Sequence, residues 1–238
     1  MCYNEEDSIC EVVQRLLRAA DLHAYDLSVE VIDDGSVDRS IERLQAAFGS
    51  AAHITLLRHI RNLGLGAVLR QAFRPSDKDA VVLLCGDLQF APEDVFRLLH
   101  ELQKADLVTA LRTQRQDNSW RRLNTWIDRS MTRLLFGSDF PDVHWVRAVR
   151  ARHLSGLRFL TRSPMVDLEL ALAIQTAGGT LTTLALPHYP RMHGRASGAK
   201  WSVLVRSLMD LLRVATARSR LSPWRPSLRV RLRSPDAR

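Results

Sequence analysis

The chain has 238 residues, of which 46% are hydrophobic and 25% are charged. These proportions are close to those of an average soluble globular protein, so they exclude collagen-like, low-complexity and small disulfide-stapled classes. No apolar run approaches the roughly 18 residues that a membrane-spanning helix needs, and Met1 leads directly into polar residues, so no signal peptide is expected. The three cysteines form no C-x-x-C pair, which favours a reducing, cytosolic setting.

The net charge of +8 is unevenly distributed. Residues 191–238 contain 12 lysines and arginines but two acidic residues, whereas the rest of the chain is nearly neutral. The basic character therefore belongs to the C-terminal fifth, where it indicates either an anionic partner or a solvated extension.

Strand-like and helix-like segments alternate from Leu27 to Leu111 with short connections, which predicts a parallel sheet with helices on both faces. Asp7 or Ser8 is expected to cap the first helix. In chain order, the expected helices of this part are Glu6–Leu22, Ser36–Phe48, Ala67–Phe73 and Glu93–Lys104, and the expected strands are Leu27–Ile32, Ala52–Arg58, Ala80–Cys85 and Leu107–Leu111.

The C-terminal half has a different pattern. Its final helix is amphipathic, and the last twenty residues, rich in proline and arginine, are expected to hold little fixed structure. The expected elements are helices at Arg121–Phe136, Asp167–Ala177 and Trp201–Ala217 and a strand at Thr180–Leu186, and the apolar side of the final helix is formed by Trp201, Leu204, Val205, Leu208, Leu211, Leu212 and Ala215.

Three of the expected strands end in polar or glycine residues, and ligands of such sheets bind outside the carboxyl ends of the strands. Asp33 and Asp34 come first, and adjacent carboxylates there can accept hydrogen bonds from a base or a ribose. An ordinary strand-to-helix turn would contain the same residues. Asp87, followed by the amide of Gln89, suits a hard Mg²⁺ or Mn²⁺ ion that shares its shell with a diphosphate, although a lone aspartate after a strand is more often a turn former.

Five motifs occur in a fixed order, and together they resemble the family 2 glycosyltransferases with the GT-A fold. Within that family the chain is most similar to the polyprenyl-phosphate branch, which includes the dolichyl-phosphate mannose synthase-like enzymes. The resemblance spans about residues 2–200. The motifs are Tyr3-Asn4-Glu5-Glu6, Val31–Asp38, Asn62–Ala67, Gly86–Gln89 and His188–Arg191.

The resemblance implies an α/β fold of the GT-A type, a Rossmann-like sheet with helices on both faces, and a nucleotide-sugar site at its edge. By this resemblance Asp33 and Asp34 contact base and ribose, and Asp87 and Gln89 hold Mg²⁺ or Mn²⁺. The remaining nucleotide-sugar residues that it implies in the first half of the chain are Tyr3, Asn4, Glu5, Asn62, Gly64 and Gly66.

Two features depart from the family pattern. The family's Asp-x-Asp metal motif has Cys85 in place of its first aspartate, and a thiol is a poor ligand for a hard cation. The first strand of the family is missing, because Met1 and Cys2 alone precede Tyr3. The start is therefore expected to be truncated or misassigned, or the sheet to lack a central member.

Later motifs carry the cations of the expected reaction. Arg112 and Arg115 resemble the family's arginine-bearing loop near donor phosphate and acceptor, where a guanidinium binds phosphate bidentately; a solvated basic face is the alternative. Asp142 aligns with an aspartate near the acceptor and is the candidate base or orienting group. The late loop is expected to close over the donor diphosphate with Arg191, Arg195 and Lys200.

The predicted function is therefore inverting transfer of a sugar from a nucleoside diphosphate donor, of GDP-mannose or UDP-glucose type, to a polyprenyl phosphate or related lipid or glycan acceptor. Two alternatives stay open: a degenerate, non-catalytic glycosyltransferase-like binding module, and a nonspecific nucleic-acid binder through the basic tail. No specific nucleic-acid partner is expected, because the body carries no excess positive charge.

The expected organisation is a glycosyltransferase domain at residues 1–200 followed by an amphipathic helix and basic tail at residues 201–238. The expected location is cytoplasmic. The helix and tail fit peripheral attachment to the anionic cytoplasmic face of a membrane, and the alternative is a helix that packs on the domain.

Overall fold

The computed structural model describes residues 1–113, 133, 146–191 and 201–221, and the account that follows concerns these residues. The expected helix at 121–136, apart from position 133, and the expected disorder of the last residues lie outside them. The described helices are α1 (Ile9–His23), α2 (Ser40–Phe48), α3 (Leu65–Ala72), α4 (Val95–Glu101), α6 (Val166–Thr176) and α7 (Trp201–Leu221), with short 3-10 turns at Pro92–Asp94 and Ala151–His153.

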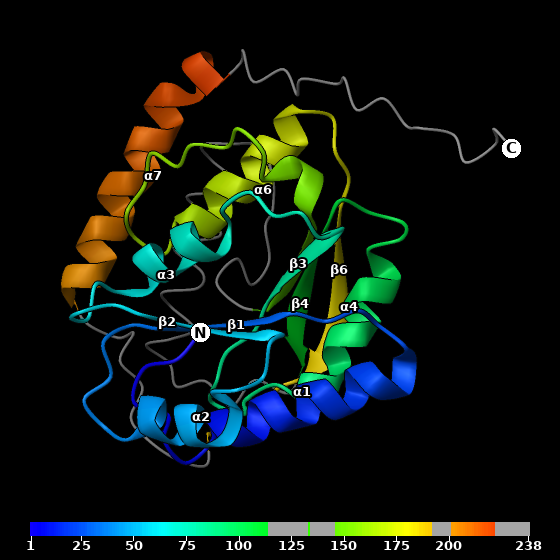
Figure 1. The fold of residues 1–238 in the computed structure, drawn as a ribbon. Coiled ribbons are helices and arrows are strands. Elements are labelled where there is room, and N and C mark those ends of the chain that lie inside the picture. The colour runs from blue at the N-terminus through cyan, green and yellow to red at the C-terminus, as the bar shows by residue number, and fades with distance from the viewer. Residues whose placement is uncertain (114–132, 134–145, 192–200, 222–238) are drawn as a thin grey trace, which may run out of the picture.

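The strands are arranged in one layer that has two hydrogen-bonded parts (Figure 1). The strands are β1 (Val29–Asp33), β2 (Ile54–Arg58), β3 (Ala80–Leu83), β4 (Leu107–Thr113), β5 (Arg147–Arg150) and β6 (Leu181–Pro187). The smaller part is the parallel pair β1-β2, and the larger part has the order β3-β5-β4-β6. The expected α/β architecture and its alternation of strands and helices are confirmed.

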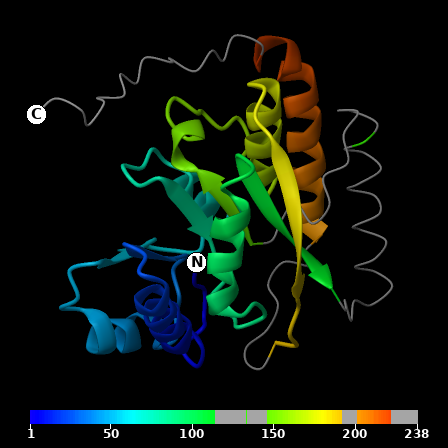
Figure 2. The same ribbon diagram turned by 90° about the vertical axis from the view of Figure 1, so that its right-hand side faces the viewer.

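Helices cover both faces of this layer. On one face, α1 and α4 pack on the sheet through a cluster that includes Leu16, Phe96 and Leu98. On the other, α3 and α6 contribute Leu69 and Leu170 to a second cluster. Turned by 90°, the molecule shows α7 alongside α6, away from the sheet (Figure 2). The core is thus three layers thick, with α7 as an addition.

The expected all-parallel sheet is wrong in one respect: β5 runs antiparallel between β3 and β4. Its residues Ala148 and Val149 are fully buried and pair with Val108 and Val81. β5 has four residues and lies outside the regular alternation of strands and helices, so its hydrophobic pattern is too short to predict a strand. Its place in the sheet is decided by its pairing with β3 and β4.

Two helix starts also differ from expectation. The α2 helix begins at Ser40 rather than Ser36, because the backbone N–H and hydroxyl of Ser36 both donate to the Asp33 carboxylate. Ser8 precedes α1 but makes no side-chain cap; its hydroxyl donates instead to the carbonyl of Gly86 at 2.7 Å.

The α7 helix packs on the domain through a side that coincides only in part with its predicted apolar side, since Leu211 is buried and Ala215 packs beside it. Asp210 and Val214 are fully buried on that side, and Asp210 accepts the backbone N–H groups of Arg162 and Ser163. Val205, Leu208, Met209 and Leu212, on the other side of the helix, remain about half exposed.

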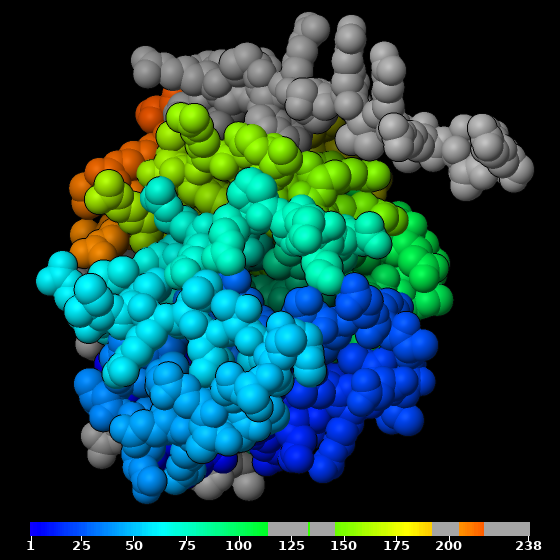
Figure 3. Space-filling view, viewed as in Figure 1, coloured from blue at the N-terminus to red at the C-terminus, as the bar shows by residue number. Residues whose placement is uncertain are grey.

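Within the described part of the chain, no helix is long and apolar enough to cross a membrane. The space-filling view from the side of Figure 1 shows the N-terminal third, coloured blue to cyan, forming the lower half of this face (Figure 3). The surface is hollowed between the blue N-terminal segment and the segment around residues 70–80.

Candidate active site

The carboxyl ends of five strands lie at one edge of the sheet layer, as parallel pairing requires. β1 ends at Asp33, β2 leads into the loop before Gly64, and β3 leads to Asp87. β4 ends with Arg112 and Thr113, and β6 leads into the segment His188–Arg191. The strand order thus brings the described candidate site residues together at this edge, where the sequence predicted that they converge.

Asp33 organises the turn after β1 and is fully buried. Its carboxylate accepts the backbone N–H and the hydroxyl of Ser36, and it lies 3.5 Å from the guanidinium of Arg58. The predicted contact of Asp33 with a base therefore stays a prediction, since in this structure its oxygens hold the turn.

Asp34 holds the loop that follows β2. Its two oxygens accept the backbone N–H groups of Leu63 at 2.9 Å and Gly64 at 2.8 Å. His59 lies 2.7 Å from the same carboxylate and 2.8 Å from the side-chain oxygen of Gln71 in α3. Burial lowers the pKa of His59, but hydrogen bonds to Asp34 and Gln71 and the nearby negative charges outweigh burial and raise that pKa. One carboxylate thus fixes the shape of this loop.

Glycines allow these two loops to approach each other. Gly35 has φ +74°, and a Cβ there would lie 2.4 Å from the backbone carbon of Arg61. Gly64 has φ +90° with open space beside it, a conformation that L side chains rarely adopt. Gly66 packs against the carbonyl of Arg162, which a Cβ would meet at 2.1 Å. Of the three, Gly64 leaves room next to the predicted nucleotide pocket, while Gly66 joins α3 to the rest of the domain.

The Tyr3-Asn4-Glu5 segment is fastened to the same turn. The Asn4 backbone lies in the left-handed region at φ 55°, and its N–H donates to the Ser36 hydroxyl at 2.8 Å. The Asn4 side-chain oxygen accepts the N–H of Val37, and the N–H of Glu5 donates to the hydroxyl of Ser40. Asn4 and Glu5 are therefore positioned beside Asp33 by hydrogen bonds between backbone N–H groups and side-chain oxygens.

Glu5, Asp87 and Arg191 form an ionic cluster at the mouth of the site. The guanidinium of Arg191 bonds to the carboxylate of Glu5 and lies 3.8 Å from that of Asp87. Burial raises the pKa of Glu5, and the negative charge of Asp87 adds to this, while Arg191 opposes it. Three residues from separate parts of the chain thus place one cation between two carboxylates.

The end of β6 is tied to the loop after β3. The backbone N–H of Tyr189 donates to the carbonyl of Gln89 at 3.1 Å. The Gln89 amide nitrogen lies 3.3 Å from a ring nitrogen of His188 and 3.4 Å from the carbonyl of Tyr189. Leu88, between Asp87 and Gln89, adopts φ 55°, a conformation uncommon outside glycine that often marks functional sites.

The described residues offer a divalent cation fewer protein ligands than the family's Asp-x-Asp motif does. The Cys85 thiol is half-buried, and burial together with the charge of Asp87 raises its pKa, so it is neutral near pH 7 and supplies no anionic ligand. No cluster of three potential ligands from histidine, cysteine, aspartate and glutamate occurs among the described residues. Mg²⁺ commonly uses one or two carboxylates together with substrate phosphates. Asp87, with Glu5 nearby, fits that mode.

The other predicted site residues are placed only in part. Arg112 lies at the end of β4, opposite Leu186 of β6, on the same edge as the ionic cluster. Asp142, Arg115, Arg195 and Lys200 lie outside the described residues, so their roles stay predictions.

Sequence reasoning missed the positioning roles of four residues at this site: His59, Ser36, Ser40 and Ser8. His59 directly follows β2, and polar residues that follow a strand of such a sheet lie at the edge where ligands bind. This position in the sequence could have identified His59 as a site residue. Ser8 and Ser36 were expected as a helix cap and a helix start, and the contacts of Ser8 with Gly86 and of Ser40 with Glu5 join residues that are far apart in the sequence.

Glu5 should make stability depend on pH. A carboxyl whose pKa is raised in the folded state contributes stability below its unfolded pKa and loses it as pH rises through the folded value. The free energy of unfolding should therefore decrease as pH rises above the ordinary glutamate value of 4.5, and Glu5→Gln should flatten this decrease. Chemical denaturation at several pH values measures it. Glu42→Gln on the exposed side of α2 controls for the loss of one negative charge, and equal slopes for wild type and Glu5→Gln would contradict the prediction.

Solved structures share this fold. A crystal structure of glucosyl-3-phosphoglycerate synthase from Mycobacterium tuberculosis, in complex with Mn²⁺, UDP-glucose and phosphoglyceric acid, superposes with a TM-score of 0.71. It is 18% identical in sequence, and the match covers 90% of this chain and 77% of that one. At this level of identity the likeness establishes the fold, which is that of the GT-A glycosyltransferases.

The family follows from the sequence. Residues 1–159 match the model of glycosyl transferase family 2, and the chain belongs to that family. An undecaprenyl-phosphate 4-deoxy-4-formamido-L-arabinose transferase from Pseudomonas aeruginosa (strain LESB58) is 40% identical over 124 residues, which are 50% of this chain and 36% of that protein. The protein of the same name from Pectobacterium atrosepticum is 31% identical over 218 residues, covering 90% of this chain and 65% of its own length. The chain thus spans between about one third and two thirds of these curated relatives.

Proposed function

We propose that the chain is an inverting glycosyltransferase that moves a sugar from a nucleoside diphosphate donor to a polyprenyl phosphate. The observation that carries the proposal is the ionic cluster of Glu5, Asp87 and Arg191 at the carboxyl edge of the sheet. It puts a guanidinium where a diphosphate would leave, next to the carboxylate expected to hold a metal. The curated relatives, named for transfer to undecaprenyl phosphate, support the acceptor class.

The donor nucleotide would bind between the two fastened loops. Asn4 and Tyr3 border one side, and Asn62 with Gly64 borders the other, where Asp34 keeps the loop in place. Because hydrogen bonds from backbone N–H groups to side-chain oxygens hold both loops, the pocket is preorganised, and less ordering has to accompany donor binding.

Mg²⁺ or Mn²⁺ would be held by Asp87, with Gln89 beside it and diphosphate oxygens completing the shell. When bound, the ion neutralises negative charge that develops on the leaving diphosphate. The chain's own contribution would be Arg191, because a guanidinium is able to donate two hydrogen bonds to phosphate oxygens. Arg191 would exchange its contact with Asp87 for the diphosphate, and Glu5 would keep it oriented.

The acceptor needs little assistance, because a phosphate monoester is already ionised near neutral pH. Arg112 at the end of β4 would attract and orient that phosphate. Arg115, Arg195 and Lys200 are proposed to add positive charge to the same site, and Asp142 to act as a base where the acceptor is a sugar hydroxyl.

Calorimetric titration with GDP and UDP, each with and without Mn²⁺, tests donor binding. We expect micromolar, metal-dependent binding of one nucleotide. Transfer of labelled sugar from the matching donor to undecaprenyl phosphate then tests the reaction. Absence of binding to both nucleotides would overturn the proposal.

A second candidate function is nucleotide binding without turnover. It is favoured by the neutral thiol of Cys85, which leaves the expected metal motif with one carboxylate. Binding of a nucleotide in the calorimeter together with no transfer to any polyprenyl phosphate would identify this second function.

We also propose that residues 1–200 form the glycosyltransferase domain and that residues 201–238 attach it to the cytoplasmic face of a membrane. The exposed side of α7 supports this, because Val205, Leu208, Met209 and Leu212 recur at helical spacing opposite the buried Asp210. Exposed Arg206 and Arg213 lie next to this stripe, and the basic residues of 191–238 complement anionic lipid headgroups.

Removal of this stripe should weaken membrane binding. The double variant Leu208→Ser with Leu212→Ser is expected to lower partitioning onto phosphatidylglycerol vesicles by about tenfold, because two half-exposed leucines lose their apolar contact with the bilayer. Vesicle co-sedimentation measures the effect. Leu22→Ser in α1, where the side chain is 85% exposed, is the matched control and should bind like the wild type. Equal binding of all three proteins would contradict the membrane role of α7.

A further inference from the structure

His59 lies where three segments of the candidate active site meet. It directly follows β2, and its backbone N–H donates to the carbonyl of Asp33 at 2.9 Å, which fixes the start of its side chain. The ring is 13% exposed and lies between two side chains. Its Nδ1 is 2.7 Å from the Asp34 carboxylate, and its Nε2 is 2.8 Å from the side-chain oxygen of Gln71. One ring therefore joins the turn after β1, the loop after β2 and α3.

The two oxygens that face the ring require a hydrogen on each ring nitrogen. The Asp34 carboxylate accepts the backbone N–H groups of Leu63 and Gly64, as an ionised carboxylate does, so it has no hydrogen to offer to Nδ1. The side-chain oxygen of Gln71 is also an acceptor. A neutral imidazole has one N–H group, whereas the imidazolium ion has two, so this geometry fits the charged form of His59.

Asp34 needs this positive charge because it is buried. A carboxylate removed from water is costly unless it is paired and hydrogen-bonded, and Asp34 is 4% exposed. Within the described residues, the basic group that forms an ion pair with Asp34 is the His59 ring. Burial lowers the pKa of His59, but hydrogen bonds to Asp34 and Gln71 and the negative charges of Asp34 and Asp33 raise that pKa by more. The charged form of His59 therefore persists to a higher pH than in a free histidine.

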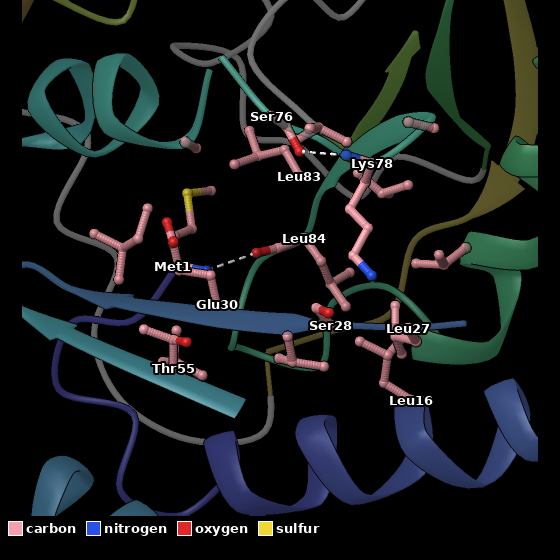
Figure 4. A pocket seen from close by; sticks show the side chains of 18 of the residues that line it. Met1, Leu16, Leu27, Ser28, Glu30, Thr55, Ser76, Lys78, Leu83 and Leu84 are labelled. Carbon is pink, nitrogen blue, oxygen red and sulfur yellow. Dashed lines mark hydrogen bonds between the residues drawn. The ribbon is translucent and has the colours of Figure 1, made fainter. Parts of the chain in front are cut away.

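The other charged side chains of the neighbouring elements contact groups other than the His59 ring. These contacts are Arg58 with Asp33, Arg70 with the carbonyl of Thr161, and Arg74 with Glu30. Arg61, in the same loop as the ring's partners, is exposed to solvent. Figure 4 shows Glu30 and Lys78 among the residues that line the cavity between β1 and β3, which His59 does not line. The charge of His59 is thus directed to Asp34.

From this geometry we infer that His59, as an imidazolium ion, is a positioning residue that holds residues 61–64 in the shape expected to receive the donor nucleotide. Loss of its proton leaves one N–H group for two acceptors, so either Asp34 or Gln71 loses its hydrogen bond and a ring lone pair faces an oxygen. The loop should therefore loosen as pH rises. The part of the inference that concerns the nucleotide rests on the proposed function, whereas the part that concerns the loop does not.

NMR titration and amide hydrogen exchange of the full chain test the loop directly. The protection factors of the Leu63 and Gly64 amides should fall by about tenfold when the pH rises through the pKa of His59, which is read from its ring signals. The side chain of the variant His59→Gln does not titrate, so its protection should be low at every pH. His53→Gln removes an exposed histidine just before β2, and this matched control should behave like the wild type.

Gln71→Met tests the direction of the second hydrogen bond. If Gln71 accepts from the imidazolium ion, loss of its oxygen should lower the pKa of His59 and move the loss of loop protection to lower pH. A rise in that pKa would show that the Gln71 amide donates to a neutral ring, and it would overturn the inference. Protection of Leu63 and Gly64 that is independent of pH, or equal in His59→Gln and the wild type, would also overturn it.

Nucleotide binding separates this inference from the proposed function. In calorimetric titrations with GDP and UDP in the presence of Mn²⁺, the wild type should bind one nucleotide about tenfold more tightly than His59→Gln at about pH 6, and the two proteins should bind it equally at about pH 8.5. If the loop follows the charge of His59 but neither nucleotide binds, the proposed donor site is wrong and the role of His59 in the loop stands. If a nucleotide binds equally to both proteins at every pH, the positioning role is wrong and the proposed function stands.

Discussion

Replacement of Asp87 by asparagine is expected to lower the turnover number for sugar transfer by about a thousandfold. Asp87 supplies the carboxylate at the end of the β3 segment that fits a divalent cation, and an amide lacks the charge to replace it. Metal-dependent nucleotide binding should weaken in parallel. The fold should be retained, because the partly exposed contact of Asp87 with Arg191 spans 3.8 Å and such pairs contribute about 1 kcal/mol or less.

Cys85→Ser is the matched control for this experiment. Because the Cys85 thiol is neutral near pH 7, a hydroxyl in its place changes no charge, and the dependence of turnover on Mn²⁺ concentration should be the same as in the wild type. If Asp87→Asn turned over substrate at the wild-type rate, Asp87 would not be the metal ligand. A large loss in Cys85→Ser would instead assign a role to the thiol.

The largest loss of stability is expected at the buried ion pair between β5 and α6. Arg147 and Asp167 are each 1% exposed, and their charged groups lie 3.3 Å apart. Burial lowers the pKa of Arg147, and the negative charge of Asp167 opposes that shift. Asp167→Leu should lower the free energy of unfolding by about 3–5 kcal/mol, because it leaves the guanidinium buried without its partner charge. Urea denaturation followed by circular dichroism measures the change.

The double variant Arg147→Met with Asp167→Leu distinguishes loss of the pair from loss of packing. Removal of both charges also removes the cost of taking them out of water, so this variant should be about as stable as the wild type or more stable. If the double variant lost as much stability as Asp167→Leu alone, packing around α6 would be the cause and the electrostatic account would be wrong.

The individual elements were largely predictable because their signals are local. The periodicity of Glu6–Leu22 predicted α1, and the apolar run at Ala80–Cys85 predicted β3. The polar residues after each strand predicted one edge of the sheet as the site, since parallel strands bring their carboxyl ends together. The ordered motifs led to the correct family.

Partners far apart in the chain were not predictable. Glu5 and Arg191 are separated by 186 residues, yet they form one ion pair. The sequence also did not indicate that Asp34 accepts the backbone N–H groups of Leu63 and Gly64. A carboxylate that follows a strand is equally suited to bind a ligand and to hold a neighbouring loop. Asp210 helps to decide which side of α7 is exposed. This polar residue is buried because it accepts the backbone N–H groups of Arg162 and Ser163.

By itself, then, the sequence determined most of the segments that become helices and strands, the edge of the sheet where the candidate site residues gather, and the family to which the chain belongs. Periodicity and short motifs act over a few residues and need no knowledge of their partners. The tertiary structure alone decided that β5 enters the sheet in reverse and that Arg191 stands between Glu5 and Asp87. These features depend on packing and hydrogen bonds between distant segments, and such contacts exist only when the whole domain is assembled.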